Sequence, residues 1–277
     1  MALPGRVSAV MRRLALSAGA LVAAVSFSSC SSVDSTSTAA HVNGHRLTMD
    51  QLSALTNNST DGATIRTALT TWIEVVAVTD DASGMSTDVE LSARKSVALK
   101  GLLGQFGDEA QTTYALGVNG SPLLCLAAIP LADTVDSATV LAALAAGTTF
   151  AEVATTYSAD PTLASTGGIV VSTDGVECIA ADKFNPELIA SLTQAGAEVG
   201  TPVTIELQAK KVVVMLRPYE ELSLSDAELL QLSANEFGAA LSKSYESSDI
   251  GVAARLGSWD NAQGLVVAVG APAVAAG

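Results

Sequence analysis

Apolar positions along the first part of the chain follow a helical period. The spacing between residues 62 and 79 predicts a helix. Two more helices are predicted from the capping-box pattern, in which a Thr precedes a Gln or Glu by three residues, at Thr48 and Thr87. Asn43-Gly44 is a strong hairpin turn signal and predicts a short pair of strands at residues 39–47. The helical period of residues 62–79 is carried by Ile65, Leu69, Trp72, Ile73 and Val76.

The pattern changes near residue 119, after a stretch rich in glycine. The apolar run at residues 123–131 has the length of a buried strand. Further periodicity and capping signals predict the order β-α-α-β-α-β-β. The helices are expected at residues 137–146, 150–157 and 186–193, and the later strands at 169–171, 203–207 and 211–216. This region is therefore predicted to be α+β, with a domain boundary near residue 119.

The last fifty residues predict a helix and then strands. Ser225 with Glu228 forms another capping box and opens a helix expected to reach about Tyr245. Residues 250–269 are strand-like and contain Trp259. In a region poor in aromatic residues, this Trp is expected to act as a packing anchor.

The N-terminus has the features of an export signal. Three Arg residues precede the uncharged apolar run 14–27, which is shorter than the roughly 20 residues of a membrane span. The following Ser28-Ser29-Cys30 resembles a bacterial lipobox, in which the Cys receives lipid. Cleavage before Cys30 would leave a lipid-anchored tether at residues 30–39; the alternative is an uncleaved anchor helix. No later stretch reaches 18 consecutive apolar residues.

Charge and composition exclude several function classes. The chain has 28 acidic and 14 basic residues, a net charge of −14, and without residues 1–29 the balance is 28 to 11, or −17. Phosphate-binding surfaces need clustered Lys and Arg, so nucleic acid is not expected as a partner. The only histidines are His41 and His45, which excludes Ser-His-Asp triads and HExxH zinc sites. These two are expected to be solvent-facing, and no metal or cofactor is predicted.

One family resemblance lies within residues 123–219. The segment GTTFAEVA at 147–154 is followed by YSADP at 157–161 and by Gly167-Gly168. Together with FNPEL at 184–188 and the apolar strand at 210–216, this order resembles parvulin-type peptidyl-prolyl isomerases. The N-terminal segment resembles the chaperone part of SurA- and PrsA-like foldases. The resemblance implies a helical chaperone-like domain at 40–118, a parvulin-like domain with a four-stranded antiparallel sheet at 119–219, and a C-terminal helix and strand at 220–277 that return to the first domain.

The resemblance also implies a function and a site. Phe184 and Leu188 take the positions of the proline pocket, whereas Ala128 and Lys211 take the positions of the two active-site histidines. An exported, lipid-anchored foldase is therefore expected at the outer face of the bacterial cytoplasmic membrane or in the cell envelope. It would bind unfolded or extended exported polypeptides with weak or absent isomerase activity. Two alternatives stay open: an active isomerase that uses other polar groups, and a non-catalytic envelope lipoprotein with a single partner.

Two cysteines remain after Cys30. Outside the cytoplasm, Cys125 and Cys178 can form a disulfide or stay as buried free thiols, and the residues alone leave this open. The resemblance places Cys125 in the first strand of the sheet and Cys178 after its neighbour. It therefore implies a disulfide between them.

Overall fold

The N-terminal hairpin is part of a three-stranded sheet with the C-terminal segment. The computed structural model describes residues 37–270, so the predicted signal, Cys30 and most of the predicted tether lie outside the described residues. Strands β1 (Thr38–Val42) and β2 (His45–Thr48) form the predicted hairpin, with Asn43 and Gly44 at positive φ. Strand β7 (Ile250–Val252) pairs with the other edge of β1. A Cβ atom at Gly251 would lie 2.2 Å from His41 Cε1, so the His41 ring can cover β7 only because this residue is glycine.

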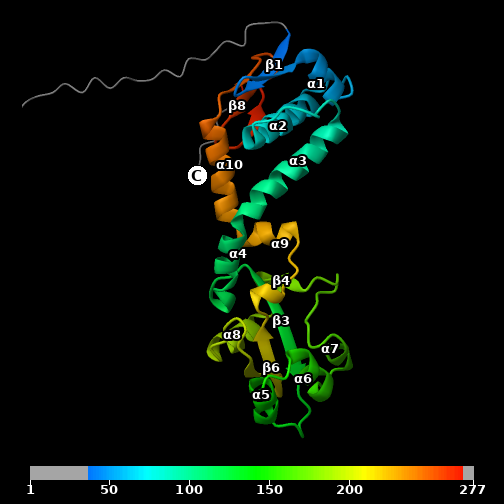
Figure 1. The fold of residues 1–277 in the computed structure, drawn as a ribbon, viewed down its shortest axis with the longest axis vertical. Coiled ribbons are helices and arrows are strands. Elements are labelled where there is room, and N and C mark those ends of the chain that lie inside the picture. Colours follow the sequence, from blue (N-terminus) through cyan, green and yellow to red (C-terminus); the bar gives the residue numbers. More distant parts are fainter. Residues whose placement is uncertain (1–36, 271–277) are drawn as a thin grey trace, which may run out of the picture. The chain divides into compact units, whose positions relative to one another are not determined.

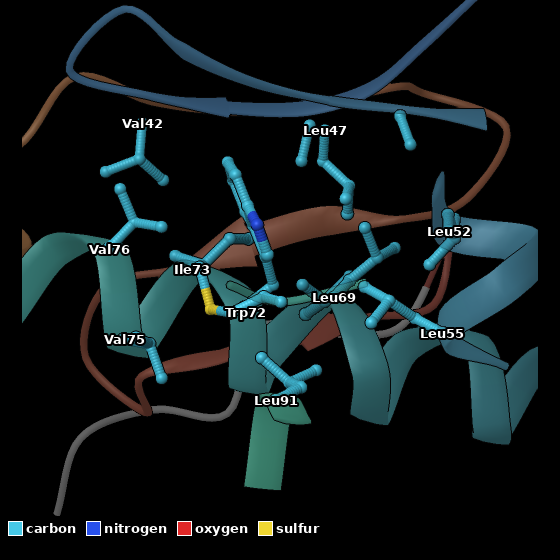
Figure 2. Close-up of a cluster of buried hydrophobic side chains, with 14 of the residues drawn as sticks. Val42, Leu47, Leu52, Leu55, Leu69, Trp72, Ile73, Val75, Val76 and Leu91 are labelled. Carbon is cyan, nitrogen blue, oxygen red and sulfur yellow. The ribbon is translucent and has the colours of Figure 1, made fainter. Parts of the chain in front are cut away.

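Three helices follow the hairpin, and all begin where the sequence predicts. They are α1 (Met49–Leu55), α2 (Gly62–Thr79) and α3 (Asp88–Leu103). Thr48 and Thr87 form the predicted capping boxes, each accepting from the third residue of its helix. The buried face of α2 packs against the hairpin through Leu69, Trp72, Ile73 and Val76 (Figure 2).

The C-terminal strands complete this core. Strands β8 (Ser258–Asp260) and β9 (Leu265–Val267) form a hairpin against α2, and the Val266 amide donates to Thr70 Oγ1 over 2.9 Å. Trp259 packs edge-to-face on Tyr245, with ring centroids 5.3 Å apart. Trp259 also contacts the core that surrounds Trp72, so its predicted role as a packing anchor is confirmed.

A four-stranded antiparallel sheet occupies the middle of the chain, in the order β4-β3-β6-β5 (Figure 1). In the hairpin between β5 and β6, Gln208 and Ala209 form the turn and both have positive φ. The chain is thus an α+β protein. The strands are β3 (Leu123–Pro130), β4 (Cys178–Ala180), β5 (Val203–Leu207) and β6 (Lys210–Leu216), and the connecting helices are α5 (Ser137–Ala145), α6 (Phe150–Tyr157), α7 (Pro161–Ser165) and α8 (Pro186–Gln194).

The two faces of this sheet are covered by different helices. Side chains alternate along each strand, so even-numbered residues of β3 and β6 share one face and odd-numbered residues share the other. The even face packs with α8 around Leu126 and Val214. The odd face packs with α5 and α6 around Ile129 and Val213 at one end. At its other end, around Cys125, it packs with α4 (Gly107–Tyr114) and α9 (Asp226–Leu232).

The predicted strand at residues 169–171 is wrong. Only a single bridge joins Ile169 to Ala127, and the edge strand β4 forms later, at Cys178–Ala180. Gly167 and Gly168 both have positive φ and form the turn before this segment. Beyond Ile169, the Val170 amide bonds the Leu126 carbonyl over 3.0 Å, and the Ser172 amide already bonds the Val176 carbonyl of the next turn. The space is also tight, because a Cβ atom at Gly168 would lie 2.8 Å from Phe150 Cε1. The two glycines therefore allow α6 to pack closely on this segment.

The predicted single C-terminal helix is two helices. Helix α9 ends at Leu232 and α10 (Ala234–Ser247) begins after Ser233, whose φ of −119° and ψ of 24° are not helical. Ser233 is fully buried, and its hydroxyl donates to the Leu229 carbonyl over 2.8 Å. The predicted domain boundaries near residues 119 and 219 stay a prediction.

Candidate functional site

The even face of the sheet brings together three of the predicted site residues. Asn185 caps α8, accepting from the Glu187 amide over 2.9 Å, and Pro186 occupies the first turn, as the sequence predicts. This start places Phe184 just before the helix and Leu188 in its first turns. Both side chains, half-buried, pack with Ala128 against the same cluster.

Lys211 does not join them. Ala128 lies opposite Val214 in the β3–β6 ladder, so the two side chains are on the same face. Lys211 is three residues from Val214 along β6, and side chains an odd number of residues apart lie on opposite faces. Its exposed side chain therefore points to the other face, where Glu206 is its partner across β5. On β6, the neighbouring Val212 shares the face of Ala128, and it is 8% exposed.

The chemistry of the even face is apolar. Lys210, the first residue of β6, is exposed at the hairpin end of this face. The other positions of the face on β3 and β6 are Leu124, Leu126, Ala128, Pro130, Val212, Val214 and Leu216. None of these side chains donates or accepts a hydrogen bond or carries a proton at neutral pH. The face can bind apolar groups by contact, but these strand positions supply no acid, base or hydrogen-bond donor to a reacting amide.

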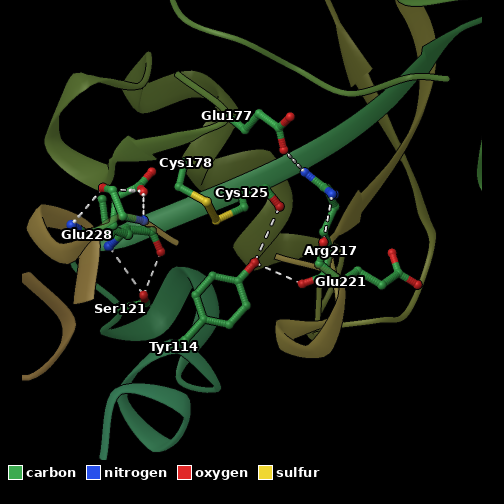
Figure 3. The surroundings of a disulfide bond; sticks show 10 residues. Tyr114, Ser121, Cys125, Glu177, Cys178, Arg217, Glu221 and Glu228 are labelled. Atoms are coloured by element: carbon green, nitrogen blue, oxygen red, sulfur yellow. Dashed lines mark hydrogen bonds and ion pairs between the residues drawn. A yellow bond between two sulfur atoms is a disulfide. The ribbon is translucent and has the colours of Figure 1, made fainter. Parts of the chain in front are cut away.

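The odd face contains a cross-strand disulfide. Cys125 on β3 and Cys178 on β4 lie directly opposite each other, with Cα atoms 4.2 Å apart, and are joined as a disulfide (Figure 3). Both cysteines are buried against Tyr114 and Leu232. The bond attaches the three-residue edge strand to the centre of the sheet.

Polar residues beside the disulfide were not found from the sequence. The Arg217 side chain is 10% exposed, and its Nη1 donates to Glu177 Oε2 over 2.6 Å. Its Nη2 donates to the Glu221 carbonyl over 3.2 Å. The Tyr114 hydroxyl lies 2.9 Å from the Arg217 carbonyl and 3.4 Å from that of Cys125 (Figure 3). One signal in the sequence could have indicated Arg217. Side chains alternate between the two faces along a strand, so Arg217, two residues after Met215, falls on the odd face.

The two histidines each face one acid. His41 Nε2 lies 3.6 Å from Asp249 and His45 Nε2 lies 3.7 Å from Asp80. The side chain of His41 is only 15% exposed, so the expectation that it faces solvent is wrong; it covers Gly251 instead. Within residues 37–270, no group of three or more His, Cys, Asp or Glu side chains is placed to hold a metal ion.

Stability is expected to fall at high pH through Tyr114. Burial raises the pKa of Tyr114 from 10.0 to about 12. Between these values the folded protein keeps a proton that the unfolded chain releases, so the free energy of unfolding falls as the pH rises from 10 to 12. The contribution is fully present below pH 10. Chemical denaturation across this range should show the decline, and Tyr114→Phe should reduce its slope. An equal slope in the variant would contradict the assignment to Tyr114.

The fold and the candidate site define an α+β protein with an apolar sheet face and a buried disulfide. Among the helices formed by residues 37–270, none is long and apolar enough to cross a membrane. No family model and no curated protein matches the chain.

Solved structures with some similarity are PrsA proteins. PrsA from Bacillus subtilis has 16% identity and a TM-score of 0.29, with 58% of this chain and 63% of that chain covered. PrsA peptidylprolyl isomerase from Bacillus anthracis has 11% identity and the same TM-score, with 72% and 94% covered. Foldase protein PrsA from Streptococcus pneumoniae has 16% identity and a TM-score of 0.29, with 57% and 62% covered. This chain thus spans less than two thirds of the Bacillus subtilis and Streptococcus structures.

Proposed function

We propose that this chain is an exported foldase or chaperone with a degenerate parvulin-type domain. The protein binds extended, apolar or Pro-containing segments of exported polypeptides. Its isomerase activity is weak or absent. The order of parvulin-like motifs in residues 123–219 supports the assignment. So does the antiparallel sheet, in which the first and last strands of that region, β3 and β6, lie side by side.

The apolar even face is the observation that carries the proposal. An isomerase must stabilise a twisted X-Pro amide against a barrier of roughly 18–20 kcal/mol, and it needs oriented polar groups to do so. Ala128 and Val212 offer none on this face, and no histidine follows His45 in the sequence. Loss of such groups costs about 10²–10³ in rate. Phe184 and Leu188 keep the apolar contact surface.

The proposed location follows from the N-terminal sequence. The signal-like residues 1–29 and Cys30 would place the protein at the outer face of the cytoplasmic membrane, where exported chains emerge unfolded. A lipid on Cys30 and a short polar tether would keep the local concentration of the binding face high. The net charge of −17 without residues 1–29 favours solubility and contact with basic client segments.

The direct test measures catalysis and binding together. The mature chain is expected to leave the cis/trans isomerisation of a Xaa-Pro peptide close to its uncatalysed rate, while it suppresses the aggregation of an unfolded client. Phe184→Ala should weaken suppression because it removes apolar contact surface from the even face. Val97→Ala, a change at an exposed position on α3, is the matched control.

Other outcomes select the alternatives. Strong acceleration that Phe184→Ala abolishes would overturn the proposal in favour of an isomerase that works without histidine. Inactivity in both assays, with capture of one envelope protein, would favour a single-partner interaction module.

A further inference from the structure

A cavity opens on the odd face of the sheet. Its volume is about 660 Å³, within the range of ligand-binding sites. Ala127 and Met215, opposite each other on β3 and β6, form its floor. Both have odd numbers, so the cavity is separated by the sheet from Ala128 and Phe184. Residues of α5 and α6, the helices that pack on this face, also line the cavity.

The walls of this cavity are mainly aliphatic and aromatic. Leu141 and Leu144 of α5 and Phe150 of α6 line it on the helical side, and Pro202 and Pro218 line it near β5 and β6. These side chains favour an apolar ligand by burying its surface. None of these side chains belongs to the apolar cluster of the even face, where client binding is proposed.

Arg217 supplies a cation at this cavity. Its guanidinium has five N–H donors, and the hydrogen bonds to Glu177 and to the Glu221 carbonyl use two of them. The Arg217 side chain is nine-tenths buried. A buried guanidinium in an apolar wall attracts a carboxylate more strongly than an exposed one because little water screens it.

Two acids lie near Arg217 and must be weighed against this attraction. Glu177 pairs with Arg217, but its side chain is about half exposed. Glu221 also lines the cavity and is exposed. The Glu177 carboxylate contacts the guanidinium directly and offsets part of its positive charge, whereas water screens the exposed Glu221. An added carboxylate would therefore use the three N–H donors that Glu177 and the Glu221 carbonyl leave free.

We propose that this cavity binds the C-terminal end of a polypeptide whose last residues are aliphatic, with its terminal carboxylate on Arg217. A peptide fits better than a fatty acid because Thr148 also lines the cavity, and its hydroxyl has no hydrogen-bond partner among residues 37–270. The hydroxyls of Thr149 and Thr166 bond Glu152 and backbone carbonyls instead. A peptide group can bond the Thr148 hydroxyl, whereas an acyl chain cannot. The site is independent of the function proposed for the even face.

Methionine methyl NMR tests this binding directly. Without the signal, the chain has three methionines, Met49, Met85 and Met215, and only Met215 lines the cavity. The peptide acetyl-alanyl-leucyl-alanyl-valine with a free carboxylate should shift the Met215 methyl resonance and leave the other two unchanged. It should bind about tenfold more tightly than the same peptide ending in an amide, as expected for a charge-assisted hydrogen bond. Equal affinity, or no shift at Met215, would overturn the proposal.

Three further arms separate the explanations. Arg217→Gln should remove the preference for the acid while the amide peptide still binds; if this variant does not fold, the comparison of acid and amide on the unchanged protein still decides. Ala145→Trp, at an exposed cavity position of α5, should block binding, and Ala142→Trp, exposed on α5 outside the cavity, should not. Octanoate binding as tightly as the peptide would overturn the peptide assignment in favour of a fatty-acid site.

Discussion

Replacing both Cys125 and Cys178 by serine is expected to lower the free energy of unfolding by about 4 kcal/mol, since the disulfide spans 53 residues and closes a long loop in the unfolded chain. The loop contains α5, α6 and α7, and its far end is held to the sheet by only three residues of β4. Guanidinium denaturation of the oxidised protein and of the double variant measures the difference.

The control for this prediction uses the same two proteins under reducing conditions. A reductant should bring the unchanged protein to the stability of Cys125→Ser/Cys178→Ser and should not affect the variant. A loss below about 1 kcal/mol would show that the cross-link restrains the unfolded chain little, contrary to the loop-closure argument. Because the even face is formed by other side chains of β3, the variant should still bind clients while it is folded.

Local signals in the sequence predict the elements well. Thr48, Thr87, Thr149 and Ser225 each form the capping box that the sequence indicates, because the interaction involves only residues three apart. The turn at Asn43-Gly44 is also indicated by its two residues, whereas Gln208 and Ala209 have positive φ although neither residue type favours it. The capping boxes and the Asn-Gly turn need no knowledge of the rest of the fold.

The site is less predictable because it depends on register between distant strands. A shift of one residue moves a side chain to the other face, which is why Lys211 cannot act beside Ala128 whereas Val212 shares its face. The capping pattern at Ser225 predicts where the last helical region begins but not its break at Ser233, which lies beyond the residues that the capping interaction involves. Strand alternation assigns Arg217 to the odd face, but its burial and its contact with Glu177 follow only from the pairing of β6 with β3.

Trp72→Ala is expected to destabilise the protein by about 3–5 kcal/mol, the usual cost of removing a large buried aromatic side chain. Trp72 of α2 is 2% exposed, and its side chain points from the helix toward the N-terminal hairpin. Its core also contains Val266 from β9, so segments from both ends of the described chain share one cluster. Denaturation followed by circular dichroism measures the loss. Val97→Ala, at an exposed apolar position on α3, should change stability by less than about 0.5 kcal/mol.

The same variant shows whether the two ends of the chain unfold together. Trp259 is then the only tryptophan left, and it packs on Tyr245 next to the core of Trp72. If β8 and β9 depend on that core, the emission of Trp259 should shift to the red in the same transition that removes the helical signal. A red shift well before the loss of helix would show instead that the C-terminal hairpin detaches on its own. In that case the cluster around Trp72 would be stabilised mainly by α1, α2 and the N-terminal hairpin.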